Sequence, residues 1–115
     1  NEGYDHYAAI AYLNDHPIGF VCACVSKDLQ NLPVKLGYIH VVGVLKPYRR
    51  QRIGTALMYA AIRWLASRGV GAVELYVDSQ NPTGAPRFFK KLGFRTIYKR
   101  LIFVRTLSNQ RDEHQ

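Results

Sequence analysis

Apolar and aromatic residues gather first in segments of strand length. Residues 7–13 and 18–25 are rich in such side chains and predict two strands. The Asn, Asp and Pro residues in segment 14–17 indicate a turn, so the two strands are expected to form a hairpin. A polar segment over 27–35 reads as a loop, and the β-branched and aromatic residues of 36–45 predict a third strand.

The spacing of apolar residues then changes to that of a helix. From residue 53 onward they recur three or four positions apart, at Ile53, Ala56, Leu57, Ala60, Ala61, Trp64 and Leu65. Arg68 suits the last turn of a helix, and Gly69 suits the left-handed position that follows it. An amphipathic helix is therefore expected to end near residue 68.

The last third of the chain predicts alternating elements. Residues 71–77 predict a strand, and the β-α-β unit that it completes should place its two strands parallel. A short helix is expected over 86–92, stopped by Gly93, followed by one or two strands within 94–107. The order β-β-β-α-β-α-β predicts an α/β fold of the mixed α+β kind, with a central twisted sheet flanked by helices.

Length and composition limit the class of protein. A chain of 115 residues with 48% hydrophobic residues predicts one globular domain over 1–115. No apolar run approaches the roughly 18–20 residues that span a membrane, so no membrane partner is expected. The sequence does not begin with Met, and we expect further residues upstream of Asn1.

Charge and cysteine content narrow the possible partners. The net charge of +8 favours an anionic partner, which could be nucleic acid, an acidic protein or a phosphorylated cofactor. Cys22 and Cys24 lack the ligand count of a structural zinc site, so we expect two buried apolar side chains and no metal. This cysteine usage fits a reducing compartment, and a cytoplasmic location is expected.

A basic turn between a strand and a helix carries the strongest chemical signal. Arg49, Arg50, Gln51 and Arg52 precede Ile53, where the helical spacing begins. The start of a helix offers unpaired N–H groups and a positive dipole end, which suit phosphate. Gly54 would let a ligand approach the backbone. The alternative is a solvated basic turn, or a patch for nucleic acid or nuclear import.

The segment V-L-K-P-Y-R-R-Q-R-I-G-T-A-L, residues 44–57, resembles the acetyl-CoA signature of the GNAT acetyltransferases, Arg/Gln-x-x-Gly-x-Gly/Ala. Arg49 and Gly54 match this signature, and Arg52 stands in place of its first glycine. A second block over 81–94 resembles N-x-x-A-x-x-x-Y-x-x-x-G-F, with the alanine one residue late and Phe89 in place of tyrosine.

The resemblance implies the GNAT acyl-CoA N-acyltransferase fold, with acetyl-CoA as cofactor. The residues that it implies for cofactor binding lie in three segments, and they are Val42, Val44, Leu45, Arg49, Arg50, Gln51, Arg52, Ile53, Gly54, Thr55, Asn81 and Phe89. The family's strand and two helices before the hairpin are not found in this chain, so we expect upstream residues or a partner protein to complete the acceptor site.

Residues 7–94 further resemble the N-terminal (Nα) acetyltransferases of the NatE type, on Tyr12-Leu13-Asn14-Asp15, Ile18-Gly19, Val21-Cys22, Tyr38-Ile39 and Pro47-Tyr48-Arg49-Arg50. The resemblance implies a catalytic role for Tyr38. The histidine that serves as base in that group is Tyr76 here, and the tyrosine that protonates the leaving thiolate is Phe89.

Strand alternation gives a separate geometric expectation. It places Tyr38 and His40 on one face of their strand together with Val42 and Val44. It also places Tyr76 on one face of the next strand with Glu74 and Asp78. We expect Tyr38, His40 and Tyr76 to converge as candidate catalytic residues, although each could simply pack. Glu74 is expected to be exposed, and His6, His16 and His114 carry no signal.

The predicted chemistry is direct attack of an amine on the acetyl thioester in a ternary complex. The α-amine of a protein or peptide is the favoured acceptor, because its pKa of roughly 7.7–8.0 leaves it partly neutral near pH 7, against about 10.4 for lysine. The alternatives are acetylation of lysine or of a small-molecule amine, CoA binding without turnover, and nucleic-acid binding. The last is disfavoured, since no stacking platform or recognition-helix pair is evident.

Overall fold

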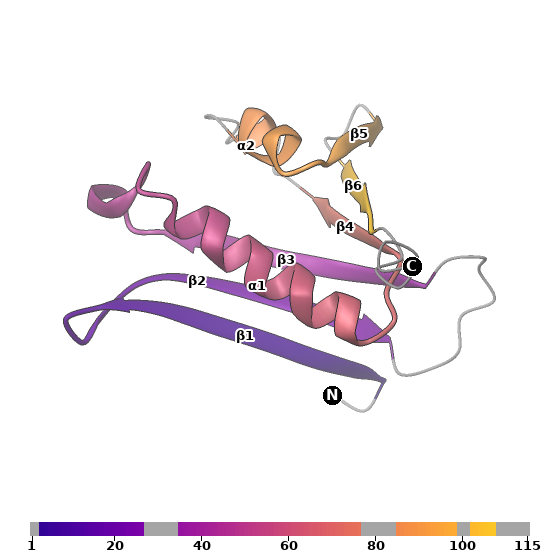
Figure 1. Ribbon diagram of the computed structural model, residues 1–115, viewed down its shortest axis with the longest axis horizontal. Helices are drawn as coiled ribbons and strands as arrows, with labels where there is room; N and C mark the ends of the chain where they lie inside the picture. Colours follow the sequence, from indigo (N-terminus) through magenta and orange to yellow (C-terminus); the bar gives the residue numbers. More distant parts are fainter. Residues whose placement is uncertain (1–2, 27–34, 77–84, 99–101, 108–115) are drawn as a thin grey trace, which may run out of the picture.

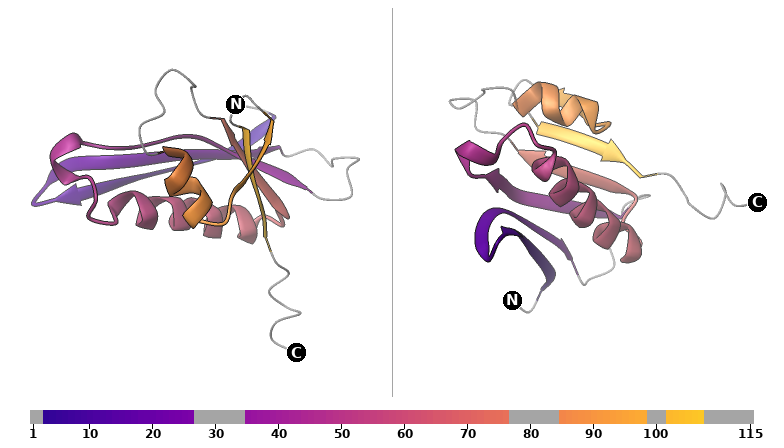
Figure 2. Two further views of the ribbon diagram at one scale, coloured as in Figure 1. Left: turned by 90° about the horizontal axis from the view of Figure 1, so that it is seen from above. Right: turned by 60° about the vertical axis from the view of Figure 1, so that its left-hand side comes forward.

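The computed structural model describes residues 3–26, 35–76, 85–98 and 102–107. These residues form one six-stranded sheet in the order β1-β2-β3-β4-β6-β5, with two α-helices on the same face (Figures 1 and 2). The elements are β1 (Tyr4–Leu13), β2 (His16–Ser26), β3 (Leu36–Val44), η1 (Lys46–Tyr48), α1 (Ile53–Ser67), β4 (Ala72–Tyr76), α2 (Ala85–Lys91), β5 (Arg95–Tyr98) and β6 (Ile102–Thr106). The predicted mixed α+β class is confirmed, and a single domain over 1–115 stays a prediction.

The hairpin of β1 and β2 turns through two residues. Asn14 and Asp15 have φ of 50° and 69°, the left-handed values that a tight two-residue hairpin loop requires. Leu13 pairs directly with His16, so the turn is shorter than the predicted segment 14–17. His16 and Pro17 belong to β2.

The β-α-β unit forms as predicted, but its two strands pair over a short length only. Leu36 to Ile39 of β3 pair in parallel with Ala72 to Leu75 of β4. Strand β3 then continues to Val44, whereas the described part of β4 ends at Tyr76. The two strands therefore part after Ile39, and the edge of β3 beyond that residue has no β4 partner within the described chain.

A β-bulge in β3 changes which side chains share a face. Ala23 of β2 pairs with Ile39, but its neighbour Cys22 pairs with Val41, which leaves His40 as the extra residue. The alternation shifts by one at this point. Val42 and Val44 consequently pack against the core beneath α1, while Tyr38 and His40 lie on the opposite face. The expectation that these four residues share one face is wrong.

Helix α1 covers one face of the sheet and holds the core together. Met58, Ala61 and Leu65 are fully buried against β2 and β3. A Cβ at Gly37 would lie 2.7 Å from the Leu65 side chain, so this glycine permits the close approach of the helix to β3. The helix ends at Ser67, and Gly69 (φ +82°) takes the predicted left-handed position just beyond the C-cap Arg68.

The opposite face of the sheet carries exposed apolar side chains. Tyr4 and Ile10 of β1, Phe20 of β2 and Val41 of β3 are between 41% and 53% exposed. Both described helices lie on the other side of the sheet (Figure 2).

The segment 94–107 forms two strands, with β6 inserted between β4 and β5 and antiparallel to both. None of the described helices is long and apolar enough to cross a membrane.

Candidate functional site

The basic turn leads from the end of β3 into α1 through an unusual backbone. Arg50 and Arg52 have φ of 66° and 67°, which is the left-handed region that favours glycine. Arg52 is the N-cap of α1 and stands where the signature has its first glycine. The position therefore keeps the backbone conformation that a glycine would adopt, although a large basic residue occupies it.

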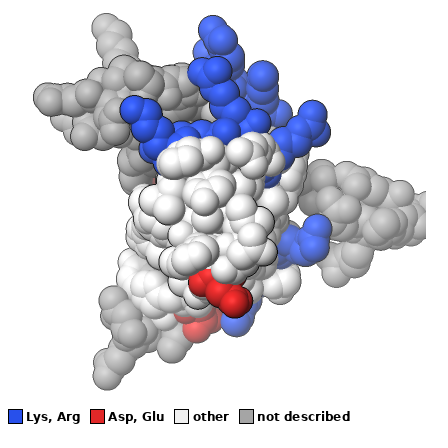
Figure 3. Space-filling view, turned by 90° about the vertical axis from the view of Figure 1, so that its left-hand side faces the viewer, with Lys and Arg blue, Asp and Glu red and all other residues white. Residues whose placement is uncertain are grey.

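The N-terminus of α1 is suited to an anion. The first backbone bond of the helix runs from the Ala56 N–H to the Arg52 carbonyl (3.1 Å), so the N–H groups of Ile53, Gly54 and Thr55 precede the helical ladder. No side chain caps them, and the first turn contains no acidic residue. Lys and Arg side chains gather along one edge of this end of the molecule (Figure 3). These features together favour phosphate.

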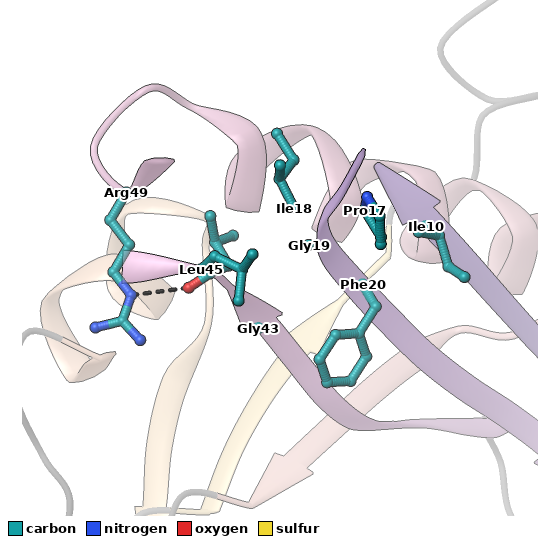
Figure 4. Close-up of a pocket in the computed structure, with 9 residues that line it drawn as sticks. Ile10, Pro17, Ile18, Gly19, Phe20, Gly43, Leu45 and Arg49 are labelled. Carbon is teal, nitrogen blue, oxygen red and sulfur yellow. Dashed lines mark hydrogen bonds between the residues drawn. The ribbon is translucent and has the colours of Figure 1, made fainter. Parts of the chain in front are cut away.

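Arg49 fixes the turn to the sheet. Its Nε donates a hydrogen bond of 2.9 Å to the carbonyl of Val44, the last residue of β3 (Figure 4). Arg49 also borders an open pocket of about 430 Å³, whose other walls come from the hairpin and the end of β3. These walls are formed by Ile10, Pro17, Ile18, Gly19, Phe20, Gly43, Val44 and Leu45. The guanidinium is exposed, so its remaining donors can reach a ligand at the turn.

Gly54 has a packing role in addition to any contact with a ligand. A Cβ at this position would lie 3.4 Å from the Phe88 ring of α2 and 3.7 Å from the Val44 side chain. The absence of a side chain therefore lets α2 lie close to the start of α1. Val42 and Val44 also pack against the core, so a cofactor would meet their backbone along the β3 edge, and Leu45 is exposed.

The second cofactor block is only partly described. Asn81 lies outside the described residues. Phe89 is 6% exposed and packs within the core, with its ring near those of Phe88 and Phe94. The structure thus gives Phe89 a packing role, and its contact with a cofactor stays a prediction.

Tyr38 and Glu74 face each other across the last paired part of β3 and β4. They are direct partners in the parallel register, and both are half-buried. Burial raises the pKa of the Tyr38 phenol, and the nearby charges of Glu74, Tyr4 and Cys24 raise it further. The phenol therefore stays protonated near neutral pH and can act as a hydrogen-bond donor.

His40 lies beside the thiol of Cys24. Its Nε2 lies 2.9 Å from the Cys24 Sγ, and Cys24 is the cross-strand partner of both Tyr38 in β3 and His6 in β1. Burial raises the pKa of the Cys24 thiol. Cys24 is buried as expected, whereas Cys22 is only partly buried.

The predicted convergence with Tyr76 is not tested. Tyr76 ends β4, but its side chain lies outside the description. Sequence reasoning missed two residues on this face of the sheet. Glu74 was expected to be exposed, and the parallel register, which the sequence does not specify, brings it opposite Tyr38. His6 was assigned no role, yet it lies inside β1 as the cross-strand partner of Cys24.

Comparison with known proteins relates this geometry to a family. The model of the acetyltransferase (GNAT) family matches residues 1–94. An uncharacterized N-acetyltransferase of Methanocaldococcus jannaschii is 38% identical over 86 residues, which is 74% of this chain and 37% of that protein. An N-alpha-acetyltransferase of Sulfurisphaera tokodaii is 30% identical over 116 residues, covering 84% of this chain and 68% of the relative.

A solved structure agrees with the fold. Naa50 of Arabidopsis thaliana, in complex with the bisubstrate analogue CoA-Ac-MVNAL, superposes with a TM-score of 0.68 at 27% identity, over 89% of this chain and 72% of that one. Acetyl-CoA, the predicted cofactor, and acyltransferase, the predicted enzyme class, agree with these matches. The family model covers well over half of the 115 residues. This chain therefore belongs to the GNAT acetyltransferase family.

Proposed function

We propose that the protein transfers acetyl from acetyl-CoA to an amine by direct attack, and that the α-amine of a protein or peptide is its acceptor. The observation that carries this proposal is the course of β3. The strand leaves β4 at Ile39, beside Tyr38 and Glu74, and then leads directly to the anion-binding start of α1. One strand thus connects the proposed phosphate site to the pair Tyr38 and Glu74.

The donor substrate fits this path. The N–H groups at the start of α1, with Arg49, Arg50 and Arg52, would hold the pyrophosphate. The edge of β3 beyond Ile39 offers backbone groups to an extended ligand in the manner of an added strand. A thioester bound along this edge would bring its carbonyl to the point where the two strands part.

The polar pair suits the reacting end. The amine nitrogen bonds to the acetyl carbon, the carbon–sulfur bond breaks, and CoA leaves as a thiolate that takes up a proton. Tyr38, which keeps its proton near neutral pH, can orient the amine or a water by hydrogen bonding. Glu74, directly opposite, can accept the amine proton through a water. Phe89 has no proton to donate, so the thiolate is protonated by solvent.

The choice of an α-amine as the acceptor rests on similarity to known proteins and on the pKa of α-amines. The Sulfurisphaera relative is named an N-alpha-acetyltransferase, and the Arabidopsis structure holds an analogue that joins CoA to a peptide. An α-amine needs little help to lose its proton near pH 7. Glu74 places a carboxylate opposite Tyr38, and a carboxylate base would also help to deprotonate a lysine, so lysine is the acceptor to test against. The chain spans 37% of the length of its Methanocaldococcus relative, and upstream residues or a partner would complete the acceptor site.

The test follows CoA release with peptides whose N-terminus is free or blocked. Wild type is expected to act on the free peptide, and Tyr38→Phe should lower kcat by roughly 10²–10⁴-fold. Tyr59→Phe, a change of the same kind on the exposed surface of α1, is the control and should be neutral. Equal turnover of Tyr38→Phe would remove Tyr38 from the reaction, and equal activity on a blocked peptide with lysine would overturn the α-amine.

A further inference from the structure

Three potential metal ligands meet on the face of the sheet opposite α1. His6, Cys24 and His40 come from the adjacent strands β1, β2 and β3. Each offers one ligand atom, and these atoms all lie within 4.8 Å of one another. No other group of this kind occurs among the described residues.

The backbone places these ligands for structural reasons. His6 and Cys24 are direct partners in the β1–β2 ladder, so their side chains emerge side by side on the same face. His40 is the extra residue of the β3 bulge, and the bulge turns it toward Cys24, with Nε2 2.9 Å from Sγ. All three stand on paired strands, which hold ligands more rigidly than loops do.

The distances and donor types match a zinc-class ion. Zinc binds thiolate at about 2.3 Å and imidazole at about 2.0–2.1 Å, so tetrahedral geometry separates neighbouring ligand atoms by about 3.6 Å. The His40–Cys24 distance of 2.9 Å would have to lengthen by about 0.7 Å, and this change and the other separations lie within reach of side-chain rotation. One sulfur with two imidazoles is a donor set that favours zinc over magnesium or calcium.

Access is open on one side. His6 and His40 are exposed, whereas Cys24 is buried at the base between them. An ion could therefore enter from the open face and meet the thiol last, and the thiol would release its proton to solvent on coordination. We propose that His6, Cys24 and His40 form a binding site for a divalent zinc-class ion, with the fourth coordination position open toward solvent.

The location gives the site a consequence. Cys24 is the cross-strand partner of Tyr38, so the bound ion would lie next to the proposed reaction centre. A water or an acceptor amine could occupy the open position. This consequence rests on the proposed function, whereas metal binding itself does not, and the experiment therefore measures binding without acetyl-CoA.

The test titrates the full chain, free of any polyhistidine tag, with Zn²⁺ in competition with a chromogenic chelator. One ion per chain is expected. Replacing Zn²⁺ with Co²⁺ should give the visible bands of a four-coordinate ion and a thiolate-to-cobalt charge-transfer band. Cys24→Ser should abolish that band, and His6→Ala should lower Zn²⁺ affinity by more than about tenfold, since even outer-shell partners are worth 10–100-fold.

Matched controls separate this site from adventitious binding. Cys22→Ser changes the other cysteine of the same strand, and His16→Ala changes an exposed histidine at the hairpin turn. Both should bind like wild type. His6 is exposed, so its variant is expected to fold even if Cys24→Ser does not. Failure to bind Zn²⁺, a charge-transfer band that survives Cys24→Ser, or unchanged affinity in His6→Ala would overturn the proposal.

Discussion

Tyr38 and Glu74 are direct partners at the end of the short parallel ladder between β3 and β4. One residue further along, the ladder stops and the bulge begins. The pair therefore lies where the sheet opens, with a neutral phenol and a carboxylate on the same face. This arrangement gives the proposed reaction a proton acceptor that no motif in the sequence indicated.

Replacing the carboxylate tests that role. Glu74→Gln keeps the size of the side chain and removes its basicity, so kcat should fall by roughly 10²-fold or more, with little change in the KM for acetyl-CoA. Steady-state kinetics on a free peptide would measure this change. Glu2, outside the described residues and far along the chain from the ladder, provides a Glu→Gln control. A loss confined to KM would instead make Glu74 a binding residue.

The pKa of Tyr38 predicts how stability depends on pH. Its folded-state value lies above the ordinary value of 10.0, so the folded chain keeps a proton that the unfolded chain gives up. This contribution to stability is present below about pH 10 and is lost as pH rises through the folded pKa. Ultraviolet titration in metal-free buffer should show one phenol that ionises at a higher pH than the others. This phenol should be absent in Tyr38→Phe, and it should ionise at a lower pH in Glu74→Gln than in wild type. If a phenol with a raised pKa persists in Tyr38→Phe, the raised pKa belongs to another tyrosine.

Arg52 gives a test that separates backbone strain from charge. A left-handed conformation costs a non-glycine residue roughly 1–2 kcal/mol, so Arg52→Gly should not destabilise the fold. CoA affinity should nevertheless fall severalfold, because a phosphate contact is lost. Thermal unfolding and calorimetry would measure the two effects. Arg52→Lys retains charge and should bind more tightly than Arg52→Gly, and tighter binding by the glycine variant would contradict a contact from Arg52.

Gly54 is predicted to tolerate one methyl group but not a branched side chain. Alanine would place its Cβ 3.4 Å from Phe88, at the limit of ordinary contact, so Gly54→Ala should be close to neutral. Gly54→Val adds two methyl groups beside Phe88 and Val44 and should cost about 1–3 kcal/mol through overpacking. Urea unfolding of both variants measures the difference. Equal midpoints for the two would show that α2 does not pack here as described.

The sequence predicted the elements that depend on local patterns. The apolar spacing predicted α1, Gly69 its end, and Asn14 with Asp15 the hairpin turn. The bulge at His40 was not predicted, because strict alternation of side chains assumes that no residue is inserted in the strand. As a result, Val42 and Val44 were assigned to the wrong face of the sheet.

The register between strands far apart in the chain was not predicted from the sequence either. Nothing local in the sequence pairs Tyr38 with Glu74, because that contact depends on how a parallel strand aligns after a fifteen-residue helix. The cluster of His6, Cys24 and His40 needs three strands in register at once. The basic turn at the start of α1 was predictable because helix start, charge and glycine positions lie within one continuous segment.

The most direct measurement of the proposed function uses one peptide that has both a free α-amine and an internal lysine. The protein is incubated with this peptide and acetyl-CoA, and fragment mass spectrometry then locates the acetyl group. We predict acetylation at the N-terminal residue, with the lysine unmodified. Acetyl on the lysine alone would contradict the α-amine assignment, and an unmodified peptide despite calorimetric binding of acetyl-CoA would contradict acetyl transfer to peptides.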